Sequence, residues 1–229
     1  MKSLFRGALI ASLLATPALA NEPSTDLEKL SYSLGVIIGS QMSPAAFGEI
    51  DYLMLADGIR DAAEGSQLKM EQDQIREIVR SAQQQQERKQ AQKMLEDGER
   101  FLTANAKNEG VKVTPSGLQY VILSEGDGER PNLTDRVKVH YEGRFVDGKV
   151  FDSSIERDAP ITFLLSEVIK GWQEGLQLMS VGSKYQLFIP SILAYGPEGQ
   201  VDPRTGRQMM PPNAVLIFDV ELIGINPED

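Results

Sequence analysis

The stretch VKVHYEGRFVDGKVFDSS, from Val137 to Ser154, decides the fold of the carboxyl-terminal half of this chain. Its first limb alternates apolar and polar residues as far as Glu142, a period of two that is typical of a strand with one buried face. Asp147-Gly148 is a hairpin signal, because these two residues tolerate the positive φ angles of tight turns. The return limb carries Phe151 and Asp152, an aromatic ring beside a carboxylate. The stretch therefore predicts a β-hairpin with an apolar surface and one acid next to it.

Three later segments also place an aromatic residue beside glycine or an acid. They read VIKGW at 168–172, LAYG at 193–196 and LIFDV at 216–220. Together with the hairpin, they predict the lining of one apolar pocket. Alternation elsewhere predicts strands over 118–123, 184–189 and 214–223, and the segment 169–179 reads as a short helix.

These blocks resemble the FKBP family of peptidyl-prolyl isomerases. The resemblance runs from about Thr114 to Ile225, in order and almost without gaps, through VHYEG, VFDSS, VIKGWQEGL, AYG and PPNAVLIFDVELI. It implies an antiparallel β-sheet wrapped around one short helix, in a chain of the α+β class. It also implies a peptidyl-prolyl cis-trans isomerase that acts on unfolded or proline-containing polypeptides and uses neither a cofactor nor a metal.

The same resemblance implies which residues form the site. The catalytic positions correspond to Asp152, Tyr195 and Phe218. The substrate-binding positions correspond to Tyr141, Phe151, Arg157, Ile161, Val168, Ile169, Trp172 and Met210. Because these residues match the family's drug-binding set, macrolide inhibitors of the rapamycin type are expected to bind there. Ile161 stands where many members have an aromatic residue, and the segment 196–210 is longer than in compact members, so the rim is the part that the resemblance describes least.

The expected chemistry needs no nucleophile. Isomerisation of an Xaa-Pro amide crosses a barrier of about 20 kcal/mol, because twisting the bond breaks its conjugation. A dry apolar pocket removes the water that stabilises the planar form, and it can hold the twisted form by shape and a few dipoles. By resemblance, the Tyr195 hydroxyl and the Ile169 N–H donate to substrate carbonyls, while Asp152 fixes Tyr141 and pairs with Arg157. For Phe163 and Phe188, the interpretation as core residues is favoured over a role in the site.

Composition excludes several other kinds of site. The chain has no cysteine and a single histidine, His140, so disulfides, cysteine-based metal sites and multi-histidine metal sites are excluded. His140 is adjacent to Tyr141 on the strand and therefore points to the opposite face. The formal net charge is −10 and no basic run stands out, which argues against nucleic acid or anionic lipid as a partner.

Residues 1–20 read as a signal peptide. Lys2 and Arg6 precede an apolar run over 8–15, and Ala18-Leu19-Ala20 is a small-x-small cleavage site. A retained membrane anchor is the alternative, but the run is too short to span a bilayer as a mature helix. We therefore expect cleavage after Ala20, no membrane span in the mature chain and a periplasmic location, with association to the outer membrane left open.

The amino-terminal half reads as helical. Thr25-Asp26-Leu27-Glu28 has capping-box spacing before a helix that continues to about Gln41. Asp51 is placed to cap a second helix that Gly65 ends. Both helices carry broad apolar faces that neither can bury alone.

A third, longer helix is predicted from about Met70 to Asn108. Its centre, QQQQERKQ at 83–90, is polar on all sides and could also be a disordered linker. Helix is favoured, since both flanks have helical periodicity and glutamine is a good helix former. Gly98 is expected to weaken the helix and to permit a bend.

SYSLGVIIG at 31–39 and LADGIRDAAEG at 55–65 resemble the amino-terminal helices of the macrophage infectivity potentiator subgroup of FKBPs. That resemblance implies a homodimer formed through these helices. The expected organisation is a helical dimerisation domain at 21–70, a long connecting helix at 71–110 and the isomerase domain at 111–229. The expected function is isomerase and folding chaperone for exported proteins. The alternative is a non-catalytic dimeric holdase that binds unfolded polypeptides.

Overall fold

The computed structural model describes residues 22–42 and 44–227. The predicted signal peptide and its cleavage site lie outside these described residues. The chain divides between residues 44 and 45 into two compact units. Within the described ranges, no helix is both long enough and apolar enough to cross a membrane.

Helix α1, Asp26–Gln41, begins at the predicted capping box. The Thr25 hydroxyl accepts a hydrogen bond from the backbone N–H of Glu28, and the Glu28 carboxylate accepts one from the N–H of Thr25. The latter bond is the main reason why the pKa of Glu28 is lowered to about 2. The apolar residues of α1 are exposed in this unit, with Leu27 at 74% and Leu30 at 58% of their full accessibility. The helix thus forms as expected and presents an apolar face.

Two short helices follow, α2, Pro44–Phe47, which starts at the last residue of the first unit, and α3, Tyr52–Glu64, which lies within the second unit. The Asp51 carboxylate caps α3 by accepting hydrogen bonds from the N–H groups of Leu53 and Met54. Gly65 ends the helix with φ 65°, in the left-handed region that glycine tolerates. Leu53 and Met54 are exposed, so α3, like α1, presents apolar side chains to solvent.

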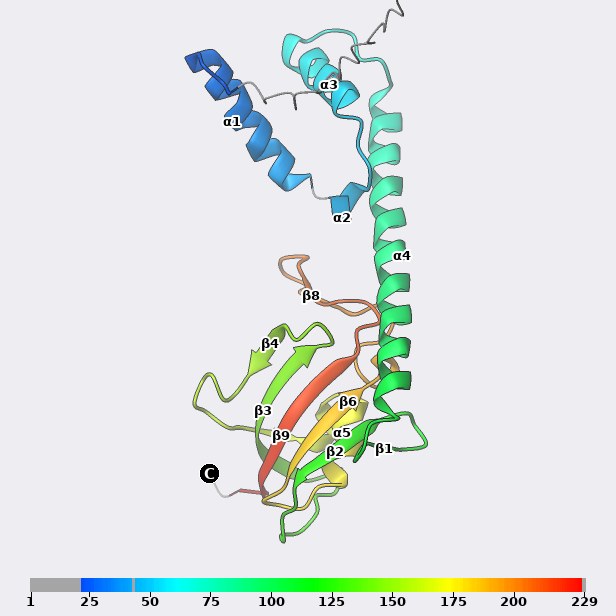
Figure 1. The fold of residues 1–229 in the computed structure, drawn as a ribbon, viewed down its shortest axis with the longest axis vertical. Helices are drawn as coiled ribbons and strands as arrows, with labels where there is room; N and C mark the ends of the chain where they lie inside the picture. Colours follow the sequence, from blue (N-terminus) through cyan, green and yellow to red (C-terminus); the bar gives the residue numbers. More distant parts are fainter. Residues whose placement is uncertain (1–21, 43, 228–229) are drawn as a thin grey trace, which may run out of the picture. The chain divides into compact units, whose positions relative to one another are not determined.

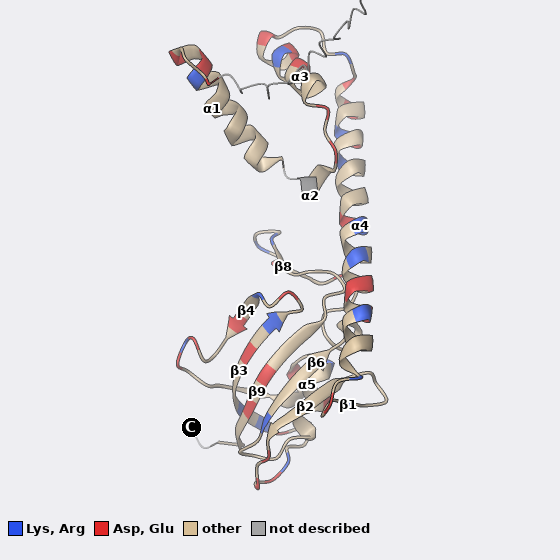
Figure 2. Ribbon diagram, viewed as in Figure 1, with Lys and Arg blue, Asp and Glu red and all other residues tan. Residues whose placement is uncertain are grey.

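Helix α4, Gln72–Asn105, runs through the glutamine-rich segment without interruption, so the helical interpretation of 83–90 is confirmed. Figure 2 shows Lys and Arg interspersed with Asp and Glu along this helix. Asp97 accepts hydrogen bonds from Lys93 and Arg100, which lie four residues before it and three residues after it. Such pairs contribute a few tenths of a kcal/mol each to an exposed helix.

A seven-stranded antiparallel sheet in the described part of the chain has the order β1-β2-β6-β9-β3-β4, with β5 also paired to β3 (Figure 1). The strands are β1 Lys112–Val113, β2 Gln119–Ser124, β3 Arg136–Phe145, β4 Val150–Ser153, β5 Ile161–Leu164, β6 Lys184–Ile189 and β9 Leu216–Ile225. A separate hairpin joins β7 Gln200–Val201 to β8 Gln208–Met210. Two single-turn 3₁₀ helices, Leu165–Glu167 and Ser191–Leu193, lie in the connections. The fold class expected from the sequence is confirmed.

The sheet wraps around helix α5, Lys170–Gln177 (Figure 1). The alternation read from the sequence holds here, because Leu216, Phe218, Val220 and Leu222 of β9 all belong to the core cluster. On α5, Trp172 and Leu176 are buried against this inner face of the sheet. The core therefore lies between α5 and the sheet.

The last part of α4 packs on the isomerase half. Gly98 is buried, and a Cβ atom there would lie 2.8 Å from a methyl carbon of Val215. The Phe101 ring lies 6.0 Å from that of Phe188, on the face of β6 opposite to the core with α5. Glycine at residue 98 thus allows close approach of the helix to Val215, a role that the sequence did not indicate, and a bend there stays a prediction. The domain bounds at residues 70 and 110 remain predictions.

Candidate functional site

A pocket of about 500 Å³ opens where β3, β4, β5, β9 and the start of α5 meet. It is lined by Tyr141, Phe151, Asp152, Ile161, Phe163, Glu167, Val168, Ile169, Trp172, Tyr195, Gln200, Met210 and Phe218. The fold thus brings together every predicted site residue except Arg157, although these residues are spread over almost 80 positions of the sequence.

Trp172 lies at the centre of an aromatic cluster. Its ring meets Tyr141 at 5.2 Å and 83° and Phe218 at 5.1 Å and 83°, both edge-to-face. Phe163 approaches the same indole at 5.4 Å. Edge-to-face pairs are favourable beyond the area that they bury, because the ring edge is positive and the ring face negative. These contacts make a rigid apolar floor of the kind that would hold a saturated five-membered ring.

Gly143 allows two of these rings to approach the sheet. A Cβ atom at this position would lie 2.7 Å from both the Phe151 and the Phe218 rings, which themselves meet edge-to-face at 5.5 Å. Any side chain at residue 143 would therefore push an aromatic wall out of place. The glycine of VHYEG has this steric role, which the sequence alone did not reveal.

One ionic group lies at the side of the pocket. The Asp152 carboxylate accepts hydrogen bonds from the Tyr141 hydroxyl and from the Arg157 guanidinium. Arg157 also donates to the Tyr141 oxygen at 3.2 Å. Arg157 does not line the pocket but holds the acid from outside. The three side chains form a closed triangle that fixes the orientation of the Tyr141 ring.

The pKa values in this group follow from burial and these bonds. Burial opposes ionisation of Asp152, but hydrogen bonds from Tyr141 and Arg157 outweigh it, and the pKa of the carboxyl falls below its ordinary value. Burial and the bond to Asp152 raise the pKa of the Tyr141 phenol. Burial, with the charge of Asp152, raises the pKa of Tyr195 as well. The Asp152 carboxylate therefore carries a fixed negative charge and the Tyr141 and Tyr195 hydroxyls are neutral, while the Glu167 side chain lines the same pocket.

Two hydrogen-bond donors border the apolar floor. Ile169 is the residue before α5, and its carbonyl accepts from the N–H groups of Trp172 and Gln173. The Tyr195 hydroxyl reaches the pocket from a loop in which Gly196 donates to the carbonyl of Ser191. The Ile169 N–H and the Tyr195 hydroxyl make no hydrogen bond to another part of the described chain. They could donate to the carbonyls of a bound peptide.

Three lining residues were not anticipated: Phe163, Glu167 and Gln200. Phe163 was weighed as a core residue, yet it lies two positions after Ile161 on β5 and so shares its face. That alternation was a usable signal. Glu167 and Gln200 come from a 3₁₀ turn and from the β7–β8 hairpin, and no pattern in the sequence points to either.

Comparison with known proteins agrees with this geometry. Residues 127–223 match the family described as FKBP-type peptidyl-prolyl cis-trans isomerase. Residues 27–122 match the domain described as amino-terminal to FKBP-type peptidyl-prolyl isomerase. A probable FKBP-type peptidyl-prolyl cis-trans isomerase of Haemophilus influenzae is 37% identical over 96% of this chain and 94% of the relative. The chain is a member of the FKBP-type peptidyl-prolyl cis-trans isomerases.

Two further relatives of this FKBP-type isomerase support the assignment over both halves. The outer membrane protein MIP of Legionella longbeachae is 36% identical and covers 97% of each chain. The crystal structure of FkpA from Escherichia coli superposes with a TM-score of 0.69 at 35% identity, covering 89% of this chain and 98% of that one. The family expected from the sequence is therefore confirmed, including its amino-terminal helical part.

Proposed function

We propose that this isomerase accelerates proline-limited folding of exported polypeptides by non-covalent catalysis in the pocket around Trp172. The observation that carries the proposal is the Tyr141–Asp152–Arg157 triangle beside the aromatic floor. A surface that merely held apolar segments would not need a charged acid fixed among its rings. A catalyst benefits, because a fixed field inside a dry pocket can act on the twisting amide.

Catalysis would proceed by differential binding. The rings of Trp172, Phe218 and Phe151 would hold the prolyl ring, while the Tyr195 hydroxyl and the Ile169 N–H would bind flanking carbonyls. Twisting of the amide removes its conjugation, and a pocket without water does not oppose this loss of charge separation. A rate gain of about 10⁵ requires about 7 kcal/mol of preferential binding of the twisted form.

Isomerisation of a four-residue Xaa-Pro peptide with an apolar residue before proline tests the proposal. We expect Asp152→Ala and Tyr195→Phe to lower kcat/KM about tenfold or more, which is about 1.4 kcal/mol of transition-state binding. Glu156→Ala, which removes an exposed acid four residues after Asp152, is the matched control and should keep the wild-type value. Trp172 is 5% exposed in the core, so Trp172→Phe is preferable to an alanine variant that would disturb the fold.

The alternative function, a non-catalytic holdase, makes the opposite prediction. A wild-type chain that delays aggregation of an unfolded protein, yet does not isomerise the peptide, would support it. Unchanged kcat/KM in both site variants would reject the assignment of Asp152 and Tyr195.

The proposal extends to assembly, inhibition and location. The exposed apolar faces of α1 and α3 support a homodimer through the amino-terminal helices. The pocket lining supports binding of rapamycin-type macrolides, which calorimetry and competition with peptide would measure. The predicted signal peptide supports a periplasmic location, and the name of the Legionella relative raises association with the outer membrane.

A further inference from the structure

The β7–β8 hairpin borders two separate hollows. Gln200 and Met210, paired across the hairpin, line the prolyl pocket. Val201 and Gln208, the next pair, line a different groove. Gln200 and Val201 face opposite sides because side chains alternate along a strand, and the register shift between the two pairs places Met210 and Gln208, two positions apart, on opposite sides as well. The hairpin is therefore a shared wall.

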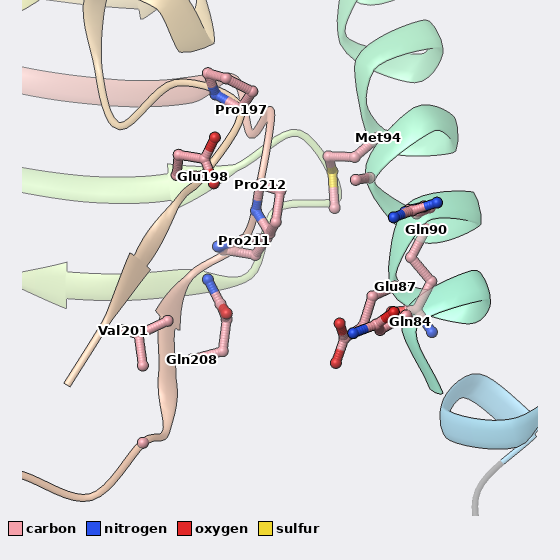
Figure 3. Close-up of a pocket in the computed structure, with 13 residues that line it drawn as sticks. Gln84, Glu87, Gln90, Met94, Pro197, Glu198, Val201, Gln208, Pro211 and Pro212 are labelled. Atoms are coloured by element: carbon pink, nitrogen blue, oxygen red, sulfur yellow. The ribbon is translucent and has the colours of Figure 1, made fainter. Parts of the chain in front are cut away.

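The second hollow is a groove of about 910 Å³ between α4 and residues 197–212. Figure 3 shows Met94 extending from α4 toward Pro211 and Pro212 on the other side. Its apolar lining consists of Ala91, Met94, Pro197, Val201, Pro211 and Pro212. Amide and charged side chains border this lining, among them Gln84, Glu87, Arg88, Glu198 and Gln208. Two carboxylates and one guanidinium line the groove, and this excess of negative charge disfavours acidic ligands.

The two walls of the groove are joined at its base. The Asn213 side chain donates a hydrogen bond of 2.9 Å to the carbonyl of Ala91 on α4. The backbone N–H of Asn213 donates to the carbonyl of Gly196 at 2.9 Å, which closes the loop that carries the hairpin. Close packing of Gly98 on Val215 fixes the same stretch of α4. The two walls of the groove, α4 and residues 197–212, are therefore held together by direct contacts.

We propose that this groove binds the stretch of a polypeptide substrate that flanks the proline held in the pocket. The inference rests on the proposed function, because the proline must lie in the pocket for its neighbours to reach the groove. The hairpin is one sheet thick, about 10 Å, and an extended chain rises about 3.3 Å per residue. A substrate therefore needs on the order of three residues to pass from one hollow to the other.

The chemistry of the groove fits an extended, uncharged and partly apolar segment. Apolar side chains of the segment would contact Met94 and the prolines, whose rings are already rigid and lose little entropy on binding. The side-chain amide of Gln84 and the amide oxygen of Gln208 would bind peptide groups without selecting a sequence, whereas the Gln208 nitrogen already donates to the carbonyls of Gln200 and Met210. The groove would make the enzyme prefer prolines inside long unfolded segments over prolines in short peptides.

Three peptides with the same Xaa-Pro core test this inference on the full-length protein. One has four residues, and the other two carry eight further uncharged residues on the amino or the carboxyl side. We expect one extended peptide to have a KM about tenfold below that of the short peptide. Met94→Asp should abolish this difference while changing the KM of the short peptide less than twofold. Leu123→Asp, an exposed apolar residue at the end of β2, is the matched control and should preserve the difference.

Equal KM values for all three peptides in the wild-type protein, or an equal loss in the Leu123→Asp control, would overturn the inference. A second measurement does not depend on variants. A benzophenone at the far end of the favoured extended peptide should cross-link to residues 84–94 or 197–212 of the wild-type protein. Cross-links confined to α1 or α3, or to other surfaces outside the groove, would contradict it.

Failure of the proposed function would look different. In that case the short peptide would not be isomerised at all, whereas failure of the groove leaves its turnover intact and removes only the advantage of length.

Discussion

The side-chain amide of Asn105 donates a hydrogen bond of 2.9 Å to Oε1 of Gln119, and both side chains are buried. Gln119 in turn donates to the carbonyl of Leu102 at 2.9 Å. The last turn of α4 is thereby joined to β2 through polar side chains that are almost fully buried. This relationship makes the end of α4 part of the structure that supports the isomerase sheet.

Removal of the end of α4 should destabilise the isomerase half. A fragment of residues 112–229 contains every pocket residue but leaves Gln119 without its partners and uncovers Phe188. An unsatisfied buried amide costs about 1–3 kcal/mol, and loss of the aromatic cover adds to this. We expect a fragment of residues 90–229 to unfold at a higher urea concentration than 112–229, with similar kcat/KM on short peptides for both. Equal unfolding midpoints would show that the contacts of α4 contribute nothing.

Gly98→Ala should lower stability even though alanine is the better helix former. Alanine gains about 1 kcal/mol of helix propensity, but its Cβ would press on the stiff side chain of Val215, and overpacking costs about 1–3 kcal/mol. The double variant Gly98→Ala/Val215→Ala provides the control. In the Val215→Ala background the same change should be neutral or stabilising, as measured by chemical denaturation. Additive effects in this cycle would reject the close-approach explanation.

The activity of the pocket should not depend on pH between about pH 5 and 9. Asp152 has a pKa below the usual value of about 3.9, so it stays ionised, and the raised pKa values of Tyr141 and Tyr195 keep both phenols neutral. Because folding lowers the pKa of Asp152, the ionised carboxylate stabilises the folded state at any pH above the pKa that it has in the unfolded chain. This stabilisation is lost as the pH falls through the pKa that Asp152 has in the folded state. Measurement of kcat/KM with an uncharged peptide from pH 5 to 9 checks the predicted pH independence of activity. A change of kcat/KM within this range would contradict the prediction.

Disruption of the apolar faces of α1 and α3 should yield a monomer. We expect Leu34→Asp together with Ile59→Asp, both at exposed positions, to halve the mass seen by sedimentation. Turnover of short peptides should stay unchanged, since neither residue lines the prolyl pocket. Refolding of a proline-limited protein should slow several-fold, because two linked sites rebind a long chain at high effective concentration. Leu123→Asp controls for the added charge. A wild-type chain that sediments as a monomer would contradict the prediction.

The sequence by itself determined the features that depend on neighbours in the chain or on a short period. Thr25 and Glu28 form their capping box from a four-residue pattern, and the Asp51 side chain caps α3 within three residues of sequence. The alternation in β9 placed Phe218 on the inner face because a strand turns its side chains with a period of two. Most of the pocket lining was therefore accessible from local pattern and family resemblance.

Only the tertiary structure decided the contacts between residues far apart in the chain. Gly98 reads as a weak point of a helix until Val215, more than a hundred residues later, is packed against it. Gln208 and Met210 are two positions apart and would share a face of a regular strand, yet a register shift in the hairpin gives Gln208 to the groove and Met210 to the prolyl pocket. The physical reason is that packing and register are set by the whole set of pairings, so no local pattern contains them.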